Sequence, residues 1–571
     1  MLRYHFDDFV VEWLPGVAST LGERPLVAAA ARFVSRELLS LYLEQALYVD
    51  LLAVAREVFR ARYLIAQGMA AAPVAAPAEL AAVLQQSVQD SGVKIVPSLK
   101  MTASSRVRAL RRQLREAIRP LRRAPPLSLH GGTIAVELVE GADPARKGDA
   151  FWLAAGLVDP ARVLFVLEGT NRALLDIESN LAAIRRVGAQ AVALDARMTA
   201  GGRVPYWRPG RAPDWAREMR AVLPAAADPP DRWLRRALMR LAKQAGDYHS
   251  FYAEHGVVAI QQFTELSTDT VVKRVAIDRV GGIEIGKMRS QWFELTSAAF
   301  HFQHEIAFVW HENVAPYLRA GHTRTRALVA VGYPYDRLPH ALREDGARLR
   351  RRFGPHVSMV AAVFDNDPHL NGHFSSADLE TFYRCVLRLA ARHDSLGVIV
   401  KSKKPGVLAK VPSISREFDA LVRAGRCLIL EDPLSSVIPA ALAAELALGF
   451  PASTAPCEAA LAGCRVVMFD SCGSSRHPWL GVDKGIIFHD PVSFEEAAST
   501  ALREITRGRR GTARERLLEL DPFLDGDSSR RAAEFLNAFA AARQAGCDKR
   551  RSLEAAIQHA KAYVFGAEAG A

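Results

Sequence analysis

The sequence predicts an α/β protein with two doubly wound domains in tandem, preceded by a helical N-terminal extension. Three observations predict this class. Short apolar, β-branched runs alternate with helical patterns from about residue 133 to residue 469. The alternation forms two successive series, the second beginning near residue 327. The first 126 residues instead show apolar residues at helical spacing. The length of 571 residues is sufficient for two large domains and an extension.

The extension, residues 1–126, is expected to end in a basic helix. Helical spacing runs from Leu26 to Ala66, and an Ala/Pro linker follows at 69–77. Between Arg106 and Arg123 there are eight arginines and one glutamate, so this segment holds seven of the twelve net positive charges of the chain. Its apolar residues form one stripe. The arginines could form a solvated face or dock on anionic lipid. A nucleic-acid partner is not expected, because neither a recognised module nor interleaved aromatic residues accompany the arginines.

The first α/β domain is predicted at 127–325 and the second at 326–545, followed by a C-terminal helix and tail at 546–571. Because strands and helices alternate at this spacing, each sheet should be parallel with right-handed crossovers. The strands are predicted at 133–139, 162–167, 191–194, 257–263, 327–331, 358–364, 396–401, 426–430 and 466–469. The main helices are predicted at 171–187, 376–391, 414–424 and 456–461.

Ligands of open parallel sheets bind outside the carboxyl ends of the strands, where helix N-termini attract anions. The segment 450–470 is the strongest candidate for such a place. Ser453 and Thr454 could cap a helix that begins at Pro456 and present hydroxyl and amide groups to a diphosphate. Glu458, one turn further on, could accept hydrogen bonds from ribose hydroxyls. The alternative is an ordinary helix cap, with Glu458 complementing the helix dipole.

The same segment has the pattern S-T-x-x-x-E-A-x-x-A-G-x-x-V-V, read from Ser453 to Val467, which resembles the donor-nucleotide segment of GT-B glycosyltransferases. Further stretches resemble bacterial surface-polysaccharide biosynthesis proteins, such as those of capsule and lipopolysaccharide. These stretches are 134–153, 274–291, 308–318, 331–336, 360–367, 398–404 and 520–531. Together they extend over about residues 130 to 540, whereas the first 125 residues match no family.

The resemblance implies two facing Rossmann-like domains, with the donor nucleotide in the C-terminal domain and the acceptor between the two. Gly332 would then lie in the interdomain connection of the donor site. Lys401 and Lys403, at the end of an apolar strand, would neutralise the donor phosphates. The alternative for these lysines is a solvated strand end.

Asp365-Asn366-Asp367 follows an apolar strand and could hold a divalent metal, line the cleft or form a polar turn. A metal is not expected, because the motif falls in the second domain and not in a single nucleotide-binding sheet. The cluster His301-x-x-His304-Glu305 resembles metal-ligand spacing, but its histidines lie at i and i+3 of a predicted helix and no third ligand lies near. We therefore predict a metal-independent enzyme without a cofactor, in which Asp365 lies in a cleft-facing loop.

If the acceptor hydroxyl attacks with inversion, a general base is needed at the strand ends of the first domain. Glu140 and Asp143 follow the first strand and are the expected candidates, with Glu168 and Glu265 as rivals. His130 precedes the first strand and would lie at the wrong end of the sheet.

The expected function is that of a glycosyltransferase which moves a sugar from a nucleotide-sugar donor to a lipid-linked glycan. The alternatives are a CDP-polyol phosphotransferase or sugar-nucleotide epimerase on the same fold, and a non-catalytic assembly scaffold. Six scattered cysteines, acidic residues within the first twelve positions and the absence of a long apolar run predict a cytoplasmic protein, peripheral at the inner membrane through 106–123.

Overall fold

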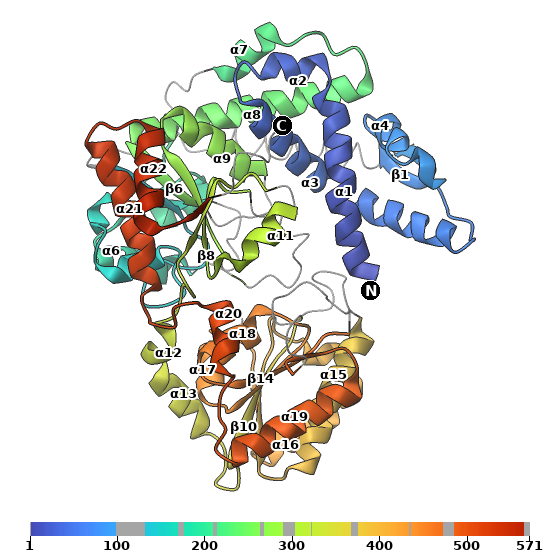
Figure 1. Cartoon of the computed structure of the whole chain (residues 1–571), viewed down its shortest axis with the longest axis vertical. Helices are drawn as coiled ribbons and strands as arrows, with labels where there is room; N and C mark the ends of the chain where they lie inside the picture. Colours follow the sequence, from blue (N-terminus) through green and yellow to red (C-terminus); the bar gives the residue numbers. More distant parts are fainter. Residues whose placement is uncertain are drawn as a thin grey trace.

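The computed structural model shows a mixed α/β protein built around two parallel sheets (Figure 1). The structure describes residues 2–98, 132–168, 176–208, 214–262, 268–288, 290, 303–320, 323–366, 375–432, 436–471 and 485–564. The basic segment 106–123 lies outside these residues. None of the described helices is long and apolar enough to cross a membrane.

The first sheet has eight strands in the order β16-β9-β8-β7-β6-β3-β4-β5. All its pairs are parallel except β16 with β9. Its strands are β3 (Thr133–Glu137), β4 (Val163–Leu167), β5 (Gln190–Ala193), β6 (Val257–Gln262), β7 (Ile283–Lys287), β8 (Ile306–Val309), β9 (Ala327–Ala330) and β16 (Tyr563–Val564).

The second sheet has six parallel strands in the order β12-β11-β10-β13-β14-β15. These strands are β10 (Met359–Phe364), β11 (Leu396–Lys401), β12 (Cys427–Leu430), β13 (Leu446–Gly449), β14 (Arg465–Phe469) and β15 (Ile487–Phe488). The predicted class of two parallel α/β sheets is therefore confirmed.

Strand β10 shows why these runs are apolar throughout. Its alternate residues point to opposite faces of the sheet, so Val360 and Ala362 enter one core while Ala361 and Val363 enter another. Helices cover both faces, which removes the polar positions that a one-sided sheet would carry.

The main helices of the two α/β units are α6 (Ile177–Val187), α7 (Trp215–Val222), α8 (Pro229–Glu254), α9 (Thr268–Arg279), α11 (Ala315–Ala320), α12 (Leu338–Ala341), α13 (Arg343–Arg350), α15 (Ser376–Arg392), α16 (Ser415–Arg423), α17 (Ile438–Leu442), α18 (Thr454–Leu461), α19 (Pro491–Thr506), α20 (Arg514–Leu520), α21 (Ser528–Gln544) and α22 (Lys549–Ala560).

The N-terminal portion is helical, as predicted, and packs on the first α/β unit. Its elements are α1 (Leu2–Gly22), α2 (Pro25–Ala30), α3 (Arg36–Ala66), β1 (Val74–Pro77), α4 (Ala81–Gln86) and β2 (Ile95–Ser98). The apolar faces of these helices share one core with α7, α8 and α9. An ion pair joins Arg24 to Asp228 at the start of α8, at 2.8 Å. The linker predicted at 69–77 is wrong in part, because β1 pairs with β2.

The predicted boundary at residue 326 is wrong. Strand β9 pairs with β8 and therefore belongs to the first sheet. The C-terminal helix α21 also returns to this unit, where Phe535 packs edge-on against Phe308 at 5.6 Å. The apolar sequence of a strand indicates that the strand is buried, but it does not indicate which sheet contains its neighbouring strand. Strands β7, β8 and β13 of the two sheets were not predicted, nor were the two-residue strands β15 and β16.

Candidate active site at the junction of the two sheets

The carboxyl edges of the two sheets meet at an ion pair between Lys147 and Glu458. Lys147 lies in the loop after β3, and Glu458 lies in α18, which follows β13. The Lys147 ammonium donates to both carboxylate oxygens of Glu458, at 2.6 and 2.8 Å. The Glu458 side chain is only 2% exposed. Since ligands of open parallel sheets bind at the carboxyl ends of strands, this junction is the candidate active site.

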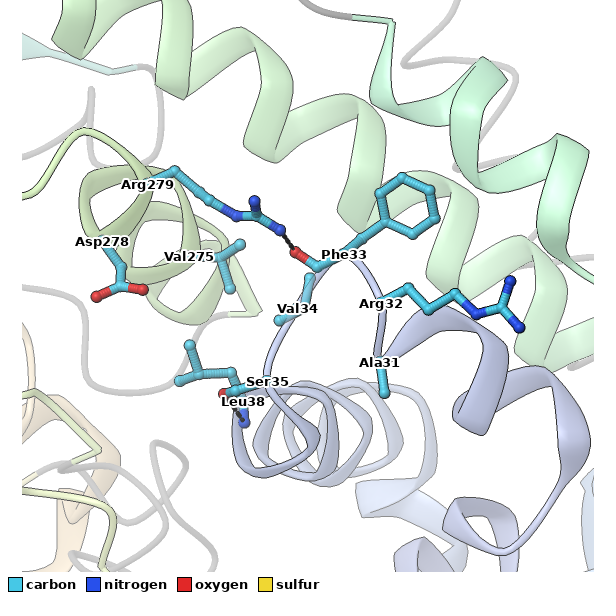
Figure 2. Close-up of a pocket in the computed structure, with 9 residues that line it drawn as sticks. All are labelled: Ala31, Arg32, Phe33, Val34, Ser35, Leu38, Val275, Asp278 and Arg279. Carbon is cyan, nitrogen blue, oxygen red and sulfur yellow. Dashed lines mark hydrogen bonds between the residues drawn. The ribbon is translucent and has the colours of Figure 1, made fainter.

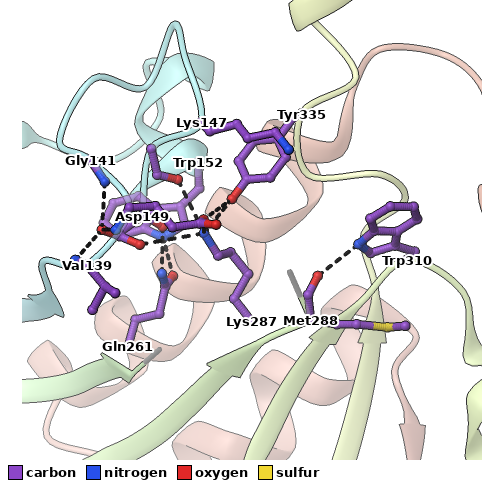
Figure 3. A network of polar contacts seen from close by, with 12 residues as sticks. Val139, Gly141, Lys147, Asp149, Trp152, Gln261, Lys287, Met288, Trp310 and Tyr335 are labelled. Carbon is purple, nitrogen blue, oxygen red and sulfur yellow. Dashed lines mark hydrogen bonds and ion pairs between the residues drawn. The ribbon is translucent and has the colours of Figure 1, made fainter. Parts of the chain in front are cut away.

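Asp149 shapes the loop that carries Lys147. Its Oδ2 atom accepts hydrogen bonds from the backbone N–H groups of Val139, Glu140 and Gly141, at 2.7, 2.9 and 3.2 Å. Gly148 is needed for this closed loop, because a Cβ atom there would lie 2.5 Å from the Asp143 carbonyl oxygen. Figure 3 shows how the network fastens the loop to β6 through Gln261, whose amide donates to the Asp149 carbonyl oxygen at 2.6 Å.

Glu140 is the carboxylate at the centre of the junction. Its Oε2 atom accepts hydrogen bonds from the Lys287 ammonium, at 3.0 Å, and from the Tyr335 hydroxyl. Lys287 is the last residue of β7, and Tyr335 follows β9, so three strand ends position one carboxylate. The Lys287 side chain is 1% exposed, whereas that of Glu140 is 23% exposed. Glu140 is thus held in place and still reached by solvent.

The protonation of the surrounding groups follows from their burial. Burial raises the pKa of Asp149 to about 7, with Lys287 opposing the shift and Glu140 adding to it. Burial, followed by the charge of Glu140, raises the pKa of the Tyr335 hydroxyl well above its usual value. Tyr335 therefore remains a hydrogen-bond donor to Glu140 at neutral pH.

The predicted cap of α18 differs from the observed one. The helix begins at Thr454 and not at Pro456, with Ser453 as its N-cap residue, and the Ser453 side chain makes no capping hydrogen bond. Glu458 lies in this helix as predicted. Its partner is a lysine from the other sheet, which the local sequence could not show.

Lys401 and Lys403 do not form one pair of cations. Lys401 is 5% exposed, and its ammonium donates to the carbonyl oxygens of Ser402 and Asp432, at 3.3 and 2.8 Å. Burial lowers its pKa. The side chain of Lys403 is exposed. Lys401 is therefore a buried strand-end cation, contrary to the solvated alternative.

Asp365 was predicted in a cleft-facing loop, and in the structure it follows β10 as a buried residue. Its carboxylate is 6% exposed and accepts from the hydroxyls of Tyr383 and Ser402 and from the Lys403 backbone N–H. These bonds fasten the end of β10 to β11. Burial raises the pKa of Asp365. Asp367 lies outside the described residues.

Gly332 lies in the connection between the two units. Its φ is 86°, and a Cβ atom there would lie 2.8 Å from a carboxylate oxygen of Asp521. The same carboxylate accepts from the Tyr333 backbone N–H at 3.0 Å. The glycine thus permits a close approach of Asp521 to the connection.

Asp143 and Glu168, two of the other candidate bases, both have basic partners. Asp143 forms an ion pair with Arg186 on α6, at 2.7 Å. Glu168 lies after β4 beside Lys273, at 3.0 Å.

His304 is buried and hydrogen bonds to Glu284. Glu265, His130 and His301 lie outside the described residues. Over the described part of the chain, no group of three or more His, Cys, Asp or Glu side chains could hold a metal.

Four residues of the junction were not singled out from the sequence. They are Lys147, Asp149, Lys287 and Tyr335, and each lies within a stretch that carries the family resemblance. The resemblance was the one signal that could have indicated them, because lysine, aspartate and tyrosine in loops are common for many reasons.

A separate hollow of about 340 Å³ lies between α9 and the connection from α2 to α3 (Figure 2). The Arg279 guanidinium donates to the Phe33 carbonyl oxygen across it. Asp278 and Ser35 also line it, and no residue of the junction does. This hollow belongs to the surface on which the N-terminal helices dock.

No protein-family model matches the sequence, and no curated protein matches it. Among solved structures, the chain is similar to a Neisseria meningitidis UDP-GlcNAc 2-epimerase bound to UDP-GlcNAc, with 10% identity over 71% of this chain and 99% of that chain, and a TM-score of 0.41. An Anabaena protein in complex with UDP and glucose has 11% identity over 74% and 98%, with a TM-score of 0.39. A Thermobaculum terrenum O-GlcNAc transferase has 13% identity over 95% and 86%, with a TM-score of 0.32. At such identities and scores, the fold and the site rest on the sheets and contacts described above.

Proposed function

We propose that the protein is a glycosyltransferase that moves a sugar from a nucleotide-sugar donor to a glycan acceptor at the junction of the two sheets. One observation carries this proposal. The Lys147–Glu458 ion pair joins the carboxyl edges of the two parallel sheets. Lys147 lies on the same loop as Glu140. A cation, a helix N-terminus and a positioned carboxylate are thereby gathered where such sheets bind nucleotides.

The donor would bind on the side of α18. The N-terminal N–H groups of this helix and the Lys147 ammonium would face the diphosphate, and Glu458 would exchange Lys147 for ribose hydroxyls. As the bond between the anomeric carbon and the phosphate oxygen breaks, the leaving nucleoside diphosphate gains negative charge. Lys147 is placed to stabilise that charge.

Glu140 would accept the proton of the attacking hydroxyl. The acceptor oxygen forms the new bond to the anomeric carbon as its proton moves to Glu140, and the electron pair of the broken bond leaves with the diphosphate. Lys287 and Tyr335 hold the carboxylate in one orientation. A sugar-nucleotide epimerase or a CDP-polyol phosphotransferase would need the same donor site, so the experiment must distinguish the reactions.

Thermal unfolding with a panel of UDP, GDP, CMP and CDP tests the donor site. At about 100 times its Kd, the preferred nucleotide should stabilise the protein by about 2.7 kcal/mol. Glu458→Gln should weaken that nucleotide about tenfold or more, because a charge-assisted hydrogen bond is lost. Glu496→Gln, at an exposed position of α19, is the matched control.

Absence of stabilisation by every nucleotide would contradict the proposal and favour a non-catalytic scaffold. If a nucleotide binds, its release from the donor is measured next. Release that occurs only when a glycan acceptor is added supports glycosyl transfer. Conversion of the donor sugar without an acceptor would instead support epimerisation, and transfer of a polyol phosphate from a CDP donor would support the phosphotransferase.

We further propose that the basic segment 106–123 docks the enzyme on an anionic membrane surface, where a lipid-linked acceptor would lie. Deleting this segment should reduce binding to phosphatidylglycerol vesicles at least tenfold, to about the level seen with neutral phosphatidylcholine vesicles. The nucleotide Kd should not change. Equal vesicle binding by the shortened protein would contradict this role.

A further inference from the structure

A second buried polar cluster lies at the carboxyl edge of the first sheet. We call it the Glu168 cluster, and it consists of Glu137, Glu168, Tyr248, Tyr252 and Lys273. The Lys273 ammonium contacts Glu137 Oε1 at 3.3 Å and Glu168 Oε2 at 3.0 Å. The Tyr248 hydroxyl donates to the same Glu168 oxygen at 3.3 Å. The side chains of Lys273, Glu137 and Glu168 are 2%, 3% and 12% exposed.

Two oxygen atoms of this cluster remain unused. Glu168 Oε1 and the Tyr252 hydroxyl are buried and have no hydrogen-bond partner among the described residues. Tyr252 is 1% exposed, and its ring stacks on that of Tyr248 at 6.1 Å. The charges of Lys273, Glu168 and Glu137 all act on its hydroxyl. A buried acceptor and a buried hydroxyl without partners are costly, so the cluster is suited to a ligand that supplies the missing hydrogen bonds.

The charge of the cluster indicates the chemistry of that ligand. Glu137 and Glu168 both face the Lys273 ammonium, and the negative charges of Glu137 and Asp269 both act on Glu168, so the groups around Glu168 other than Lys273 are negative. A second anion is therefore disfavoured, whereas a neutral group that both donates and accepts hydrogen bonds would suit Glu168 and Tyr252. A hydroxyl group has this chemistry.

The cluster also lies close in the chain to the candidate active site. Glu137 is the last residue of β3, and Glu140 comes three residues later. Glu168 follows β4, the strand beside β3. The cluster and the junction thus share one carboxyl edge of the first sheet. Their cations come from different elements, because Lys273 of the cluster lies in α9 and Lys287 of the junction lies in β7.

We propose that the Glu168 cluster is a binding subsite for a hydroxyl group of the acceptor sugar, which donates to Glu168 Oε1 and hydrogen bonds to the Tyr252 hydroxyl. This inference rests on the proposed function, since it assigns the acceptor side of the same enzyme. The subsite selects an acceptor by the hydroxyl that it presents, whereas Glu140 acts on the hydroxyl that reacts.

The subsite should depend on pH. Burial raises the pKa of Glu168 to about 7, with Lys273 opposing the shift and Glu137 and Asp269 adding to it. Burial also raises the pKa of Tyr248 and Tyr252 well above the neutral range, so these two stay protonated. A hydroxyl donates to the ionised carboxylate, and at pH 6 only about a tenth of Glu168 would be ionised. The acceptor KM should therefore be about tenfold higher at pH 6 than at pH 8.

The experiment measures release of nucleoside diphosphate from the sugar nucleotide that the thermal panel selects. The acceptor probes are methyl glycosides of glucose, galactose and N-acetylglucosamine. Glu168→Gln should raise the KM for the stimulating glycoside at least tenfold, and Tyr252→Phe about threefold or more. In both variants kcat should stay within about threefold and the nucleotide Kd within about twofold. Glu168→Gln leaves Glu137 and Lys273 as a balanced pair, and Tyr252→Phe removes one hydroxyl, so both should fold.

Glu178→Gln, on the exposed surface of the same unit, is the control for the substitution. An unchanged glycoside KM in both variants would overturn the subsite, as would a fall in kcat alone. Nucleotide binding without stimulation by any glycoside would overturn the subsite and leave the donor site standing. If no nucleotide binds, the proposed function and this subsite both fail.

Discussion

Glu140→Gln is expected to lower kcat by about 10² to 10⁴, the range that general-base catalysis contributes. The amide cannot take the proton of the acceptor hydroxyl, and it faces the same Lys287 ammonium and Tyr335 hydroxyl that hold the carboxylate. The proposed donor site consists of Lys147 and α18, so the nucleotide Kd should change by less than about threefold. Steady-state release of nucleotide and calorimetric titration measure the two quantities on the same preparation.

Glu178→Gln is the matched control, because its carboxylate pairs with Arg203 at the surface and is 60% exposed. It should leave kcat and the nucleotide Kd unchanged. A Glu140→Gln variant with full turnover would remove Glu140 from the mechanism. The same measurements on Asp143→Asn compare the second predicted base, for which the Arg186 ion pair indicates a smaller effect.

Lys273→Met is expected to lower the free energy of unfolding by about 3–5 kcal/mol, as happens when one partner of a buried charged set is removed. Glu137 and Glu168 would then lose the cation that contacts both of them. Carboxyls with folded-state pKa values above their unfolded values weaken the fold as pH rises through that interval. The deficit should therefore be larger at pH 8 than at pH 5, because protonated carboxyls need no cation. Urea unfolding at both pH values measures it.

Lys94→Met, at an exposed lysine of the N-terminal portion, is the control and should change the stability by less than about 0.5 kcal/mol. The double variant Lys273→Met/Glu168→Gln should recover part of the loss, since it removes one of the two carboxylates that Lys273 contacts. A Lys273→Met protein as stable as the wild type at pH 8 would contradict the prediction, because the cluster would then tolerate two buried charges.

The sequence predicted much of the fold because long apolar runs identify buried strands directly. The runs at 358–364 and 396–401 correspond to β10 and β11 within one residue. Strand β13 was missed because Leu446–Gly449 follows an alanine-rich segment that has no strand signal. The assignment of β9 failed for another reason: the strand was predicted, but its partner β8 was not.

The candidate site was predicted in part. Glu458 was singled out because it lies one turn into a predicted helix, and Glu140 because it follows an apolar strand; both lie at the junction. Asp365 and Lys401 satisfy the same rule, yet their polar groups bond to their own sheet. Position after a strand places a residue at the right edge of the sheet, but it does not determine where the side chain points.

The sequence alone therefore determined that the protein has two parallel α/β units, a helical N-terminal portion and a concentration of positive charge in 106–123. These properties depend on local periodicity and composition. Only the tertiary structure decided that Lys147 meets Glu458 over 311 positions of sequence and that Lys273 lies between two carboxylates. Such contacts depend on which strands pair and which loops meet. The residues next to each contact in the sequence indicate neither the strand pairing nor the loop contacts.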